Sequence, residues 1–270
     1  MRDPFTEFER DGWSRAADGY ARAYGPMTAQ AIPWLLDDAG VGRGTRLLDL
    51  ACGPGLLGEA ALGRGAIVTC ADLVMRMLEL ARHRVRRADY CIADAQALPF
   101  ADASFDAVTL AFLVGHLANP LQALSEARRV LAPDRRVAFA WWRELEHTAA
   151  FRLVRSAVER LGRTDVPIPA GPSFDQFSDP AIGESALLDL AFTDVRVHEA
   201  KLSWKTGSAQ KMFDACLEGS VRTAALLRAQ EPAALAAIRE DVIEAAKAYA
   251  DERGVLDLPM PAWIVSGAKP

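Results

Sequence analysis

Three acidic side chains and a glycine-containing loop in the first half of the chain could together hold a nucleoside. Asp49 lies within the segment LLDLACGPG, where an apolar stretch runs into a loop with Gly53 and Gly55. Glycine lets the backbone approach a ligand closely and adopt positive φ angles. Asp72 ends the next apolar stretch and could hold both ribose hydroxyls through its two carboxylate oxygens. Asp94 follows a third such stretch and could bind the exocyclic amine of an adenine.

The same loop also fits the spacing of a dinucleotide-binding fingerprint. Gly53, Gly55 and Gly58 satisfy the pattern G-x-G-x-x-G, so an NAD(P)-dependent oxidoreductase is one alternative. Two features favour a different ligand. A dinucleotide-binding strand is normally apolar up to its glycines, whereas Asp49 lies within this strand. A nicotinamide site also has no need for a third acid such as Asp94.

Short apolar stretches alternate with amphipathic ones between Arg46 and Trp142, which is typical of βαβ units and a parallel sheet. We expect strands at residues 46–50, 66–71, 89–92, 105–112 and 136–142. We expect helices between them at residues 56–62, 74–86 and 120–131. The last helix has the clearest start, because Asn119 can cap its first turn and Pro120 suits the first helical position.

The alternation ends after residue 142. One helix-like stretch at 148–161 and a loop rich in Pro and Gly follow, and we interpret residues 143–180 as a cap insertion. Strand patterns return at 192–204 and 262–268. The Ala-rich segment between these strands is divided by Glu231-Pro232, so we expect two helices there.

Four segments between Arg46 and Trp142 match the motifs of one enzyme family in order and spacing. They are LLDLACGPG, VTCADLVMRMLELAR, ADAQALPFADASFDAVTLAF and ANPLQALSEARRVLAP. Together they resemble the class I S-adenosylmethionine-dependent methyltransferases, particularly the small-molecule group of ubiquinone and menaquinone C-methyltransferases with a methyltransferase type 11 domain. The resemblance implies an α/β fold: a Rossmann-like, seven-stranded, mostly parallel sheet with helices on both faces and a helical cap.

The resemblance also implies how the chain is organised and what it binds. Residues 1–270 would form a single methyltransferase domain, with N-terminal closing helices at 1–40, a cofactor-binding core at 41–142, the cap insertion at 143–180 and C-terminal strands and helices at 181–270. S-adenosylmethionine would be the cofactor and S-adenosylhomocysteine the product. The acceptor would be a small organic molecule.

The resemblance also implies roles in cofactor binding for individual residues. Gly53 and Gly55 would line the methionine part of the cofactor, and Asp49 would lie near its amino group. Asp72 would bind the ribose, and Leu73 would pack on the adenine.

The remaining cofactor contacts are expected beside later strands and in the N-terminal segment. Asp94 and the backbone of Ala95 would bind the adenine edge, and the strand end at Ala111 and Phe112 would offer a carbonyl to the amino group. The segment GYARAYGPMTAQAIPW resembles the closing helix of relatives, with Tyr20 and Gln30 as contacts. The alternative for this segment is an amphipathic helix with core aromatics.

Two positions depart from the family pattern. Ala51 stands where the family often has glycine, and we expect alanine to be small enough to keep the loop beside the cofactor. Pro133-Asp134-Arg135 replaces a Pro-Gly-Gly turn, and we expect only a surface connection to change because Asp favours turns.

The candidate catalytic base is His116, which follows the fourth expected strand at the carboxyl edge of the sheet. Its position also matches a histidine often seen in the resembled family. The alternative is a histidine that packs under the cap or satisfies a loop carbonyl. Seven residues could roof a mainly apolar substrate cavity, and we expect two of them to touch substrate: His147, Phe151, Phe174, Phe177, Trp204, Met212 and Phe213.

Composition excludes several other classes of protein. The chain has 270 residues, 31 Lys+Arg against 36 Asp+Glu and a net charge of −5, which argues against a nucleic-acid partner. No apolar stretch approaches the roughly 20 residues that span a bilayer, and the N-terminus lacks the apolar region of a secretory signal. Four cysteines without a C-x-x-C pair indicate reduced thiols, no metal site and a cytoplasmic location.

Two further functions remain open at this point. An enzyme of the same fold could bind S-adenosylmethionine and catalyse a non-methylating reaction such as cyclisation, and a non-catalytic binding module is a weaker alternative. The acceptor atom (carbon, oxygen or nitrogen), the pathway and the oligomeric state, a homodimer included, are not determined by these motifs.

Overall fold

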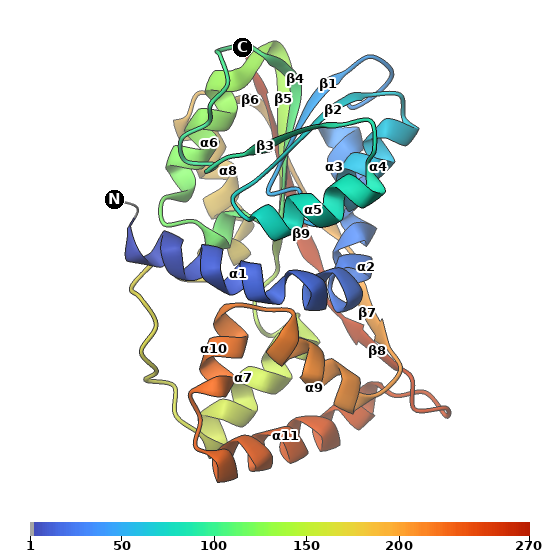
Figure 1. Ribbon diagram of the computed structural model, residues 1–270, viewed down its shortest axis with the longest axis vertical. Coiled ribbons are helices and arrows are strands. Elements are labelled where there is room, and N and C mark those ends of the chain that lie inside the picture. Colours follow the sequence, from blue (N-terminus) through green and yellow to red (C-terminus); the bar gives the residue numbers. More distant parts are fainter. Residues whose placement is uncertain (1–2) are drawn as a thin grey trace.

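A seven-stranded sheet with helices on both sides organises the computed structural model, which describes residues 3–270 (Figure 1). Its strands follow the spatial order β3-β2-β1-β4-β5-β9-β6. All neighbours pair in parallel except β9, which is antiparallel to both β5 and β6. The strands are β1 (Arg46–Leu50), β2 (Ile67–Asp72), β3 (Asp89–Ile92), β4 (Phe105–Ala111), β5 (Leu131–Trp142), β6 (Thr193–Ala200) and β9 (Ala262–Lys269). The expected α/β fold with a mostly parallel seven-stranded sheet is therefore confirmed.

Helices cover both faces of this sheet. In Figure 1, α3 and α4 lie on one side of it, and α6 and α8 lie on the other. Strands β1 and β4 carry near-continuous buried apolar residues, as expected for strands covered on both faces. The helices of this part are α1 (Pro4–Ala23), α2 (Gly25–Thr28), α3 (Ile32–Asp38), α4 (Leu56–Gly63), α5 (Met75–Arg84), α6 (Pro120–Val130) and α8 (Pro180–Asp189). Helix α6 begins as predicted, because the Asn119 side chain accepts a hydrogen bond from the Gln122 N–H at 3.0 Å.

A helical cap packs beside the carboxyl ends of the central strands. It contains α7 (Ala149–Leu161), α9 (Ala209–Glu218), α10 (Arg222–Arg228) and α11 (Pro232–Ala246), which contact one another. A small second sheet joins β7 (Ser203–Thr206) to β8 (Leu256–Pro259). Short 3-10 turns are η1 (Ala29–Ala31), η2 (Val114–His116), η3 (Gln176–Ser178) and η4 (Lys247–Tyr249). Figure 1 shows α1 running between the sheet and these cap helices.

In the second half of the chain, the structure corrects two expected elements and adds a helix. The strand expected at 192–204 is two strands in different sheets, because the chain leaves β6 after Ala200 and β7 pairs with β8. The Ala-rich segment forms three helices rather than two, with a break at Gly219 and Ser220. Helix α8 was not expected, although Asp179 caps it by accepting a hydrogen bond from the Ala181 N–H at 2.9 Å.

The departure at Pro133-Asp134-Arg135 lies on the surface, as expected. All three residues are exposed, and Asp134 has a left-handed φ of 58°. The pairing of β4 with β5 shifts register in this region, between Phe105 and Ala107. None of the helices in residues 3–270 has the length and apolar character that a bilayer crossing would require.

Candidate active site

A cavity of about 380 Å³ lies at the carboxyl ends of β1, β2 and β4, between α1 and the cap helices. In open parallel sheets, this edge is where ligands bind. Ten of the thirteen residues expected in the site line the cavity: Tyr20, Ala51, Gly53, Asp72, Leu73, Asp94, Ala95, Ala111, Phe112 and His116. The sheet edge therefore brings together residues from four separate segments.

The loop after β1 takes a left-handed backbone at two positions that line the cavity. Ala51 has φ 53° and Gly53 has φ 53°. For alanine, this conformation costs about 1 kcal/mol, which gives a physical reason for the glycine often found at that position. At Gly53, an added Cβ would meet only the Tyr20 ring, at 3.9 Å. The loop thus leaves open space beside the backbone of Gly53.

The carboxylate of Asp72 is held at the cavity wall by backbone donors. The Gly53 N–H donates to its Oδ2 at 3.0 Å, and the Val74 N–H donates to its Oδ1 at 2.9 Å. Burial raises the pKa of Asp72 to about 6, although these backbone hydrogen bonds act in the opposite direction. The two oxygens are fixed in place and can each accept a further hydrogen bond from a ligand.

Asp49 lies behind the cavity wall and does not line it. Its Oδ1 accepts a hydrogen bond from the Thr109 hydroxyl at 3.3 Å, while its Oδ2 is buried without a hydrogen-bond partner in residues 3–270. Burial raises the pKa of Asp49 to about 7, and the nearby charge of Asp72 acts in the same direction. The side chain thus lies beneath the loop rather than in the cavity wall, and its expected place near a ligand amino group stays a prediction.

Two other expected contacts also lie outside the cavity. The side-chain amide of Gln30 makes two hydrogen bonds to the backbone of β7. Its Nε2 donates to the Ser203 carbonyl at 2.7 Å, and its Oε1 accepts from the Ser203 N–H at 3.1 Å. Gly55 caps α4 with φ 84°, and an added Cβ would come within 3.1 Å of Ala81. Gln30 thus links η1 to β7, and Gly55 begins α4 beside α5.

Asp94 and Phe112 both line the cavity, one after β3 and the other after β4. The Oδ1 of Asp94 accepts hydrogen bonds from the backbone N–H of Gln96 at 3.0 Å and from its side-chain amide at 3.2 Å. Phe112 follows β4 with a left-handed φ of 56°, and its ring centroid lies 4.2 Å from that of Trp142. A bulky residue in this conformation is rare and is typical of functional sites.

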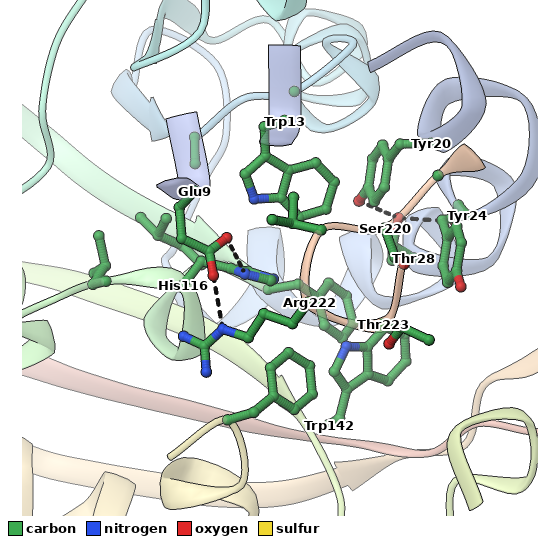
Figure 2. A pocket seen from close by; sticks show the side chains of 18 of the residues that line it. Glu9, Trp13, Tyr20, Tyr24, Thr28, His116, Trp142, Ser220, Arg222 and Thr223 are labelled. Carbon is green, nitrogen blue, oxygen red and sulfur yellow. Dashed lines mark hydrogen bonds and ion pairs between the residues drawn. The ribbon is translucent and has the colours of Figure 1, made fainter. Parts of the chain in front are cut away.

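His116 belongs to a buried charged cluster that sequence reasoning missed (Figure 2). Its Nδ1 lies 3.1 Å from the Oε2 of Glu9, which comes from α1. The other oxygen of Glu9 accepts a hydrogen bond from the Nε of Arg222 at 2.7 Å. Burial acts to raise the pKa of Glu9, but the neighbouring His116 and Arg222 outweigh it, so this pKa lies below its ordinary value. Glu9 is therefore an ionised carboxylate between two partners.

Arg222 also ties the cap to the sheet edge. Its Nη2 donates to the Gly115 carbonyl at 2.6 Å, and its Nη1 donates to the Pro172 carbonyl at 3.1 Å. The guanidinium lies over the ring of Phe5, 4.6 Å from the centroid. Its hydrogen bonds thus join α10 to α1, η2 and the loop before η3.

Aromatic rings form much of the cavity wall around this cluster (Figure 2). The His116 ring makes edge contacts with Trp13, Trp141 and Phe174, at centroid distances of 5.0, 5.4 and 5.6 Å. Of the seven residues expected to roof a substrate, Phe151 and Phe174 line the cavity. The others lie in the core or on the surface: His147, Phe177, Trp204, Met212 and Phe213.

Comparisons with known proteins agree with this geometry. A family model described as a methyltransferase domain matches residues 48–139. The chain is 43% identical over 97 residues to a demethylmenaquinone methyltransferase of Clavibacter sepedonicus, covering 35% of this chain but only 40% of that relative. It is 33% identical over 189 residues to a malonyl-acyl-carrier-protein O-methyltransferase of Erwinia pyrifoliae, covering 68% of this chain and 70% of the relative. The chain belongs to the class I S-adenosylmethionine-dependent methyltransferases.

A solved structure supports the fold of this methyltransferase. Phosphoethanolamine N-methyltransferase 2 of Haemonchus contortus, solved with S-adenosylhomocysteine, superposes with a TM-score of 0.57 at 19% identity and covers 97% of this chain and 60% of that one. At this identity, the likeness concerns the fold.

The residues of this methyltransferase fit the cofactor that its family uses. A ribose needs a fixed acceptor pair, which Asp72 provides, and an adenine needs an acceptor and an apolar face, which Asp94 and Leu73 provide. The buried, unpartnered Oδ2 of Asp49 adds negative potential beneath the loop, which suits a cationic ligand. In residues 3–270, no group of three or more His, Cys, Asp or Glu side chains is placed to hold a metal ion.

Proposed function

We propose that this chain transfers a methyl group from S-adenosylmethionine to a small organic molecule, releasing S-adenosylhomocysteine. The observation that carries the proposal is that one cavity joins the acids Asp72 and Asp94 to the His116 cluster. A cofactor and an acceptor could therefore meet inside it. The four free cysteines further support a reducing compartment such as the cytoplasm.

Each wall of the cavity has a role in this proposal. Asp72 would hold the ribose hydroxyls, Leu73 and Asp94 would bind the adenine, and the loop at Ala51 and Gly53 would line the methionine part. When bound, the cofactor would supply an electrophilic methyl group on a sulfonium sulfur, which would be the leaving group when the acceptor takes the methyl. The protein aligns the reacting groups and excludes water.

The proton of the acceptor has a destination in the same cavity. His116 lines the cavity, and its Nε2 makes no hydrogen bond to any residue in the described chain. The aromatic walls from Trp13, Trp142 and Phe174 favour a mainly apolar acceptor. We infer that His116 acts as the general base.

Calorimetric titration tests the cofactor without knowledge of the acceptor. We expect S-adenosylmethionine and S-adenosylhomocysteine to bind with micromolar affinity, and NADH to give no heat. Asp72→Ala should weaken both by at least tenfold, about 1.4 kcal/mol, because the ribose loses a charge-assisted partner. Asp89→Ala is the matched control, since Asp89 is an exposed acid at the other end of the sheet and should leave affinity unchanged.

Mass spectrometry then separates the remaining functions. Incubation with candidate acceptors should give a mass gain of one methyl group together with S-adenosylhomocysteine. Conversion of an acceptor with the cofactor left intact would favour the cyclisation alternative. Binding of NADH alone would favour the nicotinamide oxidoreductase.

A further inference from the structure

The contact between Glu9 and His116 determines which histidine nitrogen faces the cavity. Resting on the proposed function, we propose that Glu9 is a positioning residue: it holds the neutral imidazole of His116 with its proton on Nδ1, so that Nε2 accepts a proton from the acceptor. We further propose that the acceptor is a neutral, mainly apolar molecule whose reacting group is a weakly acidic hydroxyl, such as a phenol or an enol.

The charge of Glu9 decides the direction of its hydrogen bond to His116. An ionised carboxylate only accepts hydrogen bonds, so the Nδ1 at 3.1 Å must be the donor. Arg222 donates to the other oxygen at 2.7 Å and keeps this carboxylate ionised. The hydrogen bond made by one ring nitrogen fixes the state of the other, which leaves Nε2 as an acceptor.

The ring also has little freedom to turn away. Three aromatic rings pack against it from α1, β5 and the loop before η3, through Trp13, Trp141 and Phe174. The preceding residue, Gly115, fits flat on Trp141, where an added Cβ would come within 1.9 Å of the indole. Figure 2 shows the imidazole of His116 below Trp13, with a dashed line to the carboxylate of Glu9.

The reaction then has a balanced path for the proton. The acceptor's O–H bond breaks, its proton passes to Nε2, and the electron pair left on oxygen would form the bond to the methyl group as the methyl–sulfur bond of the donor breaks and its electron pair stays on sulfur. His116 becomes an imidazolium, and the adjacent Glu9 carboxylate compensates its charge. The methyl donor of the proposed function is the only co-reactant required.

The charged side chains on this part of the cavity explain the preference for a neutral acceptor. Arg222 donates to Glu9 and to two carbonyls, and the Glu9 carboxylate offsets its charge, so it offers no uncompensated positive charge to an anionic acceptor. Arg143 is paired with Glu144 and Glu199.

The other charged groups at the cavity are also accounted for. Arg155 pairs with Glu159, Arg10 pairs with Asp11, and Asp175 is exposed to solvent. The charge of Glu9 is offset by Arg222, so no net negative charge is left beside His116 to receive a cationic amine.

Nitrogen-15 NMR of the imidazole side chains tests the positioning role directly. In protein saturated with S-adenosylhomocysteine, near pH 8, we expect the His116 signals to show a proton on Nδ1 and an unprotonated Nε2. The signals that disappear in His116→Gln are those of His116. If that variant does not fold, the other three histidines are replaced one at a time: His83, His147 and His198. The signals that remain in every one of these variants belong to His116. A proton on Nε2 in the unmodified protein would overturn the proposal.

Glu9→Gln gives the matched perturbation. The side-chain carbonyl of the glutamine can accept a hydrogen bond from Arg222 or from His116, but not from both. We expect it to accept from Arg222, because a charged guanidinium is the stronger donor. The amide NH2 then faces Nδ1, which must become an acceptor, so the proton should move to Nε2. An unchanged Nδ1–H signal in a folded variant would contradict the role of Glu9. Calorimetry with S-adenosylhomocysteine separates the role of Glu9 from the proposed function. If the unmodified protein does not bind S-adenosylhomocysteine, only the proposed function is refuted.

Three probes of matched shape test the class of acceptor: 2-naphthol, 2-naphthylamine and 2-naphthoic acid. Each is added to the complex with S-adenosylhomocysteine while the His116 signals are followed, and each is then incubated with S-adenosylmethionine. We expect the naphthol to shift the Nε2 signal most and to be the probe that gains a methyl group. A larger response to the amine or the acid, or no response to any of the three, would overturn the proposed class.

Discussion

Two buried carboxylates beneath and beside the loop after β1 make the site sensitive to pH. Burial raises the pKa of Asp49 to about 7 and that of Asp72 to about 6. Both acids are thus partly protonated just below neutrality. A ligand that places a positive charge beside them favours their ionised form and lowers both pKa values.

Binding of S-adenosylmethionine should therefore release protons in a limited range of pH. Near pH 6.5, between the two pKa values, both carboxyl groups are partly protonated in the ligand-free protein and lose protons when the cationic ligand binds. Above about pH 8, both groups are already ionised, so binding should release no protons. The measurement is the binding heat in buffers of different ionisation enthalpy. Asp49→Asn should reduce the released protons, and a binding heat that is the same in every buffer at pH 6.5 would refute the prediction.

At the level of single residues, sequence motifs predict where a residue lies in the fold but not which way its side chain points. The motif segment found Gly53, Asp72 and Asp94 because each lies at or just beyond a strand end, where any short side chain reaches the cavity. It did not indicate that Asp49 lies behind the cavity wall, because the motif does not specify which way the side chain points. Glu9 was missed because its partner Arg222 is 213 positions away and α1 carries several other charges.

Helix α1 packs closely against the cap at two glycines, Gly12 and Gly19, which lie on the same face of the helix about two turns apart. At Gly19, an added Cβ would lie 2.4 Å from the backbone oxygen of Glu218. At Gly12, it would lie 2.4 Å from a methyl group of Val221, a side chain that can rotate. Glycine in a helix interior costs about 1 kcal/mol relative to alanine, so the close contact explains its presence in α1.

Gly19→Ala should weaken the packing of α1 although it improves helix propensity. We expect a loss of about 1–3 kcal/mol in unfolding free energy, because the backbone at Glu218 must move. Affinity for S-adenosylhomocysteine should fall as well, since Tyr20 adjoins this position and lines the cavity. Gly12→Ala is the milder comparison. Denaturant titration measures both variants, and a Gly19→Ala protein as stable as the parent would refute the argument.

The elements themselves differed in how well the sequence indicated them. Helix α6 was predicted with its cap because Asn119 and Pro120 are strong local signals. Helix α8 carries a similar signal at Asp179 and Pro180, which our interpretation assigned to the end of a loop. Strand β7 could not be separated from β6 by pattern alone, because its partner β8 lies about 50 residues further along the chain, a long-range pairing that leaves no local trace.

On the scale of the whole molecule, the cavity is closed by parts that are distant in sequence. The core between β1 and β5 follows family motifs and was predicted. The cap was expected only in outline, because its helices pack on one another and on α1 through contacts that no motif describes. The Arg222 hydrogen bonds to Glu9, Gly115 and Pro172 connect these parts physically.

Ligand binding should consequently protect α1 and α10 together. We expect S-adenosylhomocysteine to slow amide hydrogen exchange in α1, in η2 and in α10, while α8, away from the cavity, serves as the internal control. In Arg222→Met, α1 should still respond but α10 should no longer follow it. Hydrogen-exchange mass spectrometry measures each segment, and protection of α1 without α10 in the unmodified protein would show that the Arg222 connection is not important.

Helix α1 carries Tyr20 and Glu9 three helical turns apart, one beside the loop after β1 and the other beside His116. Under the proposed function, one rigid element then meets both ligands, so the free energies of the two binding events are linked. By thermodynamic reciprocity, the factor by which the cofactor tightens the acceptor equals the factor by which the acceptor tightens the cofactor. The enzyme would then be a heterotropic system, in which substitutions that shift α1 change both affinities.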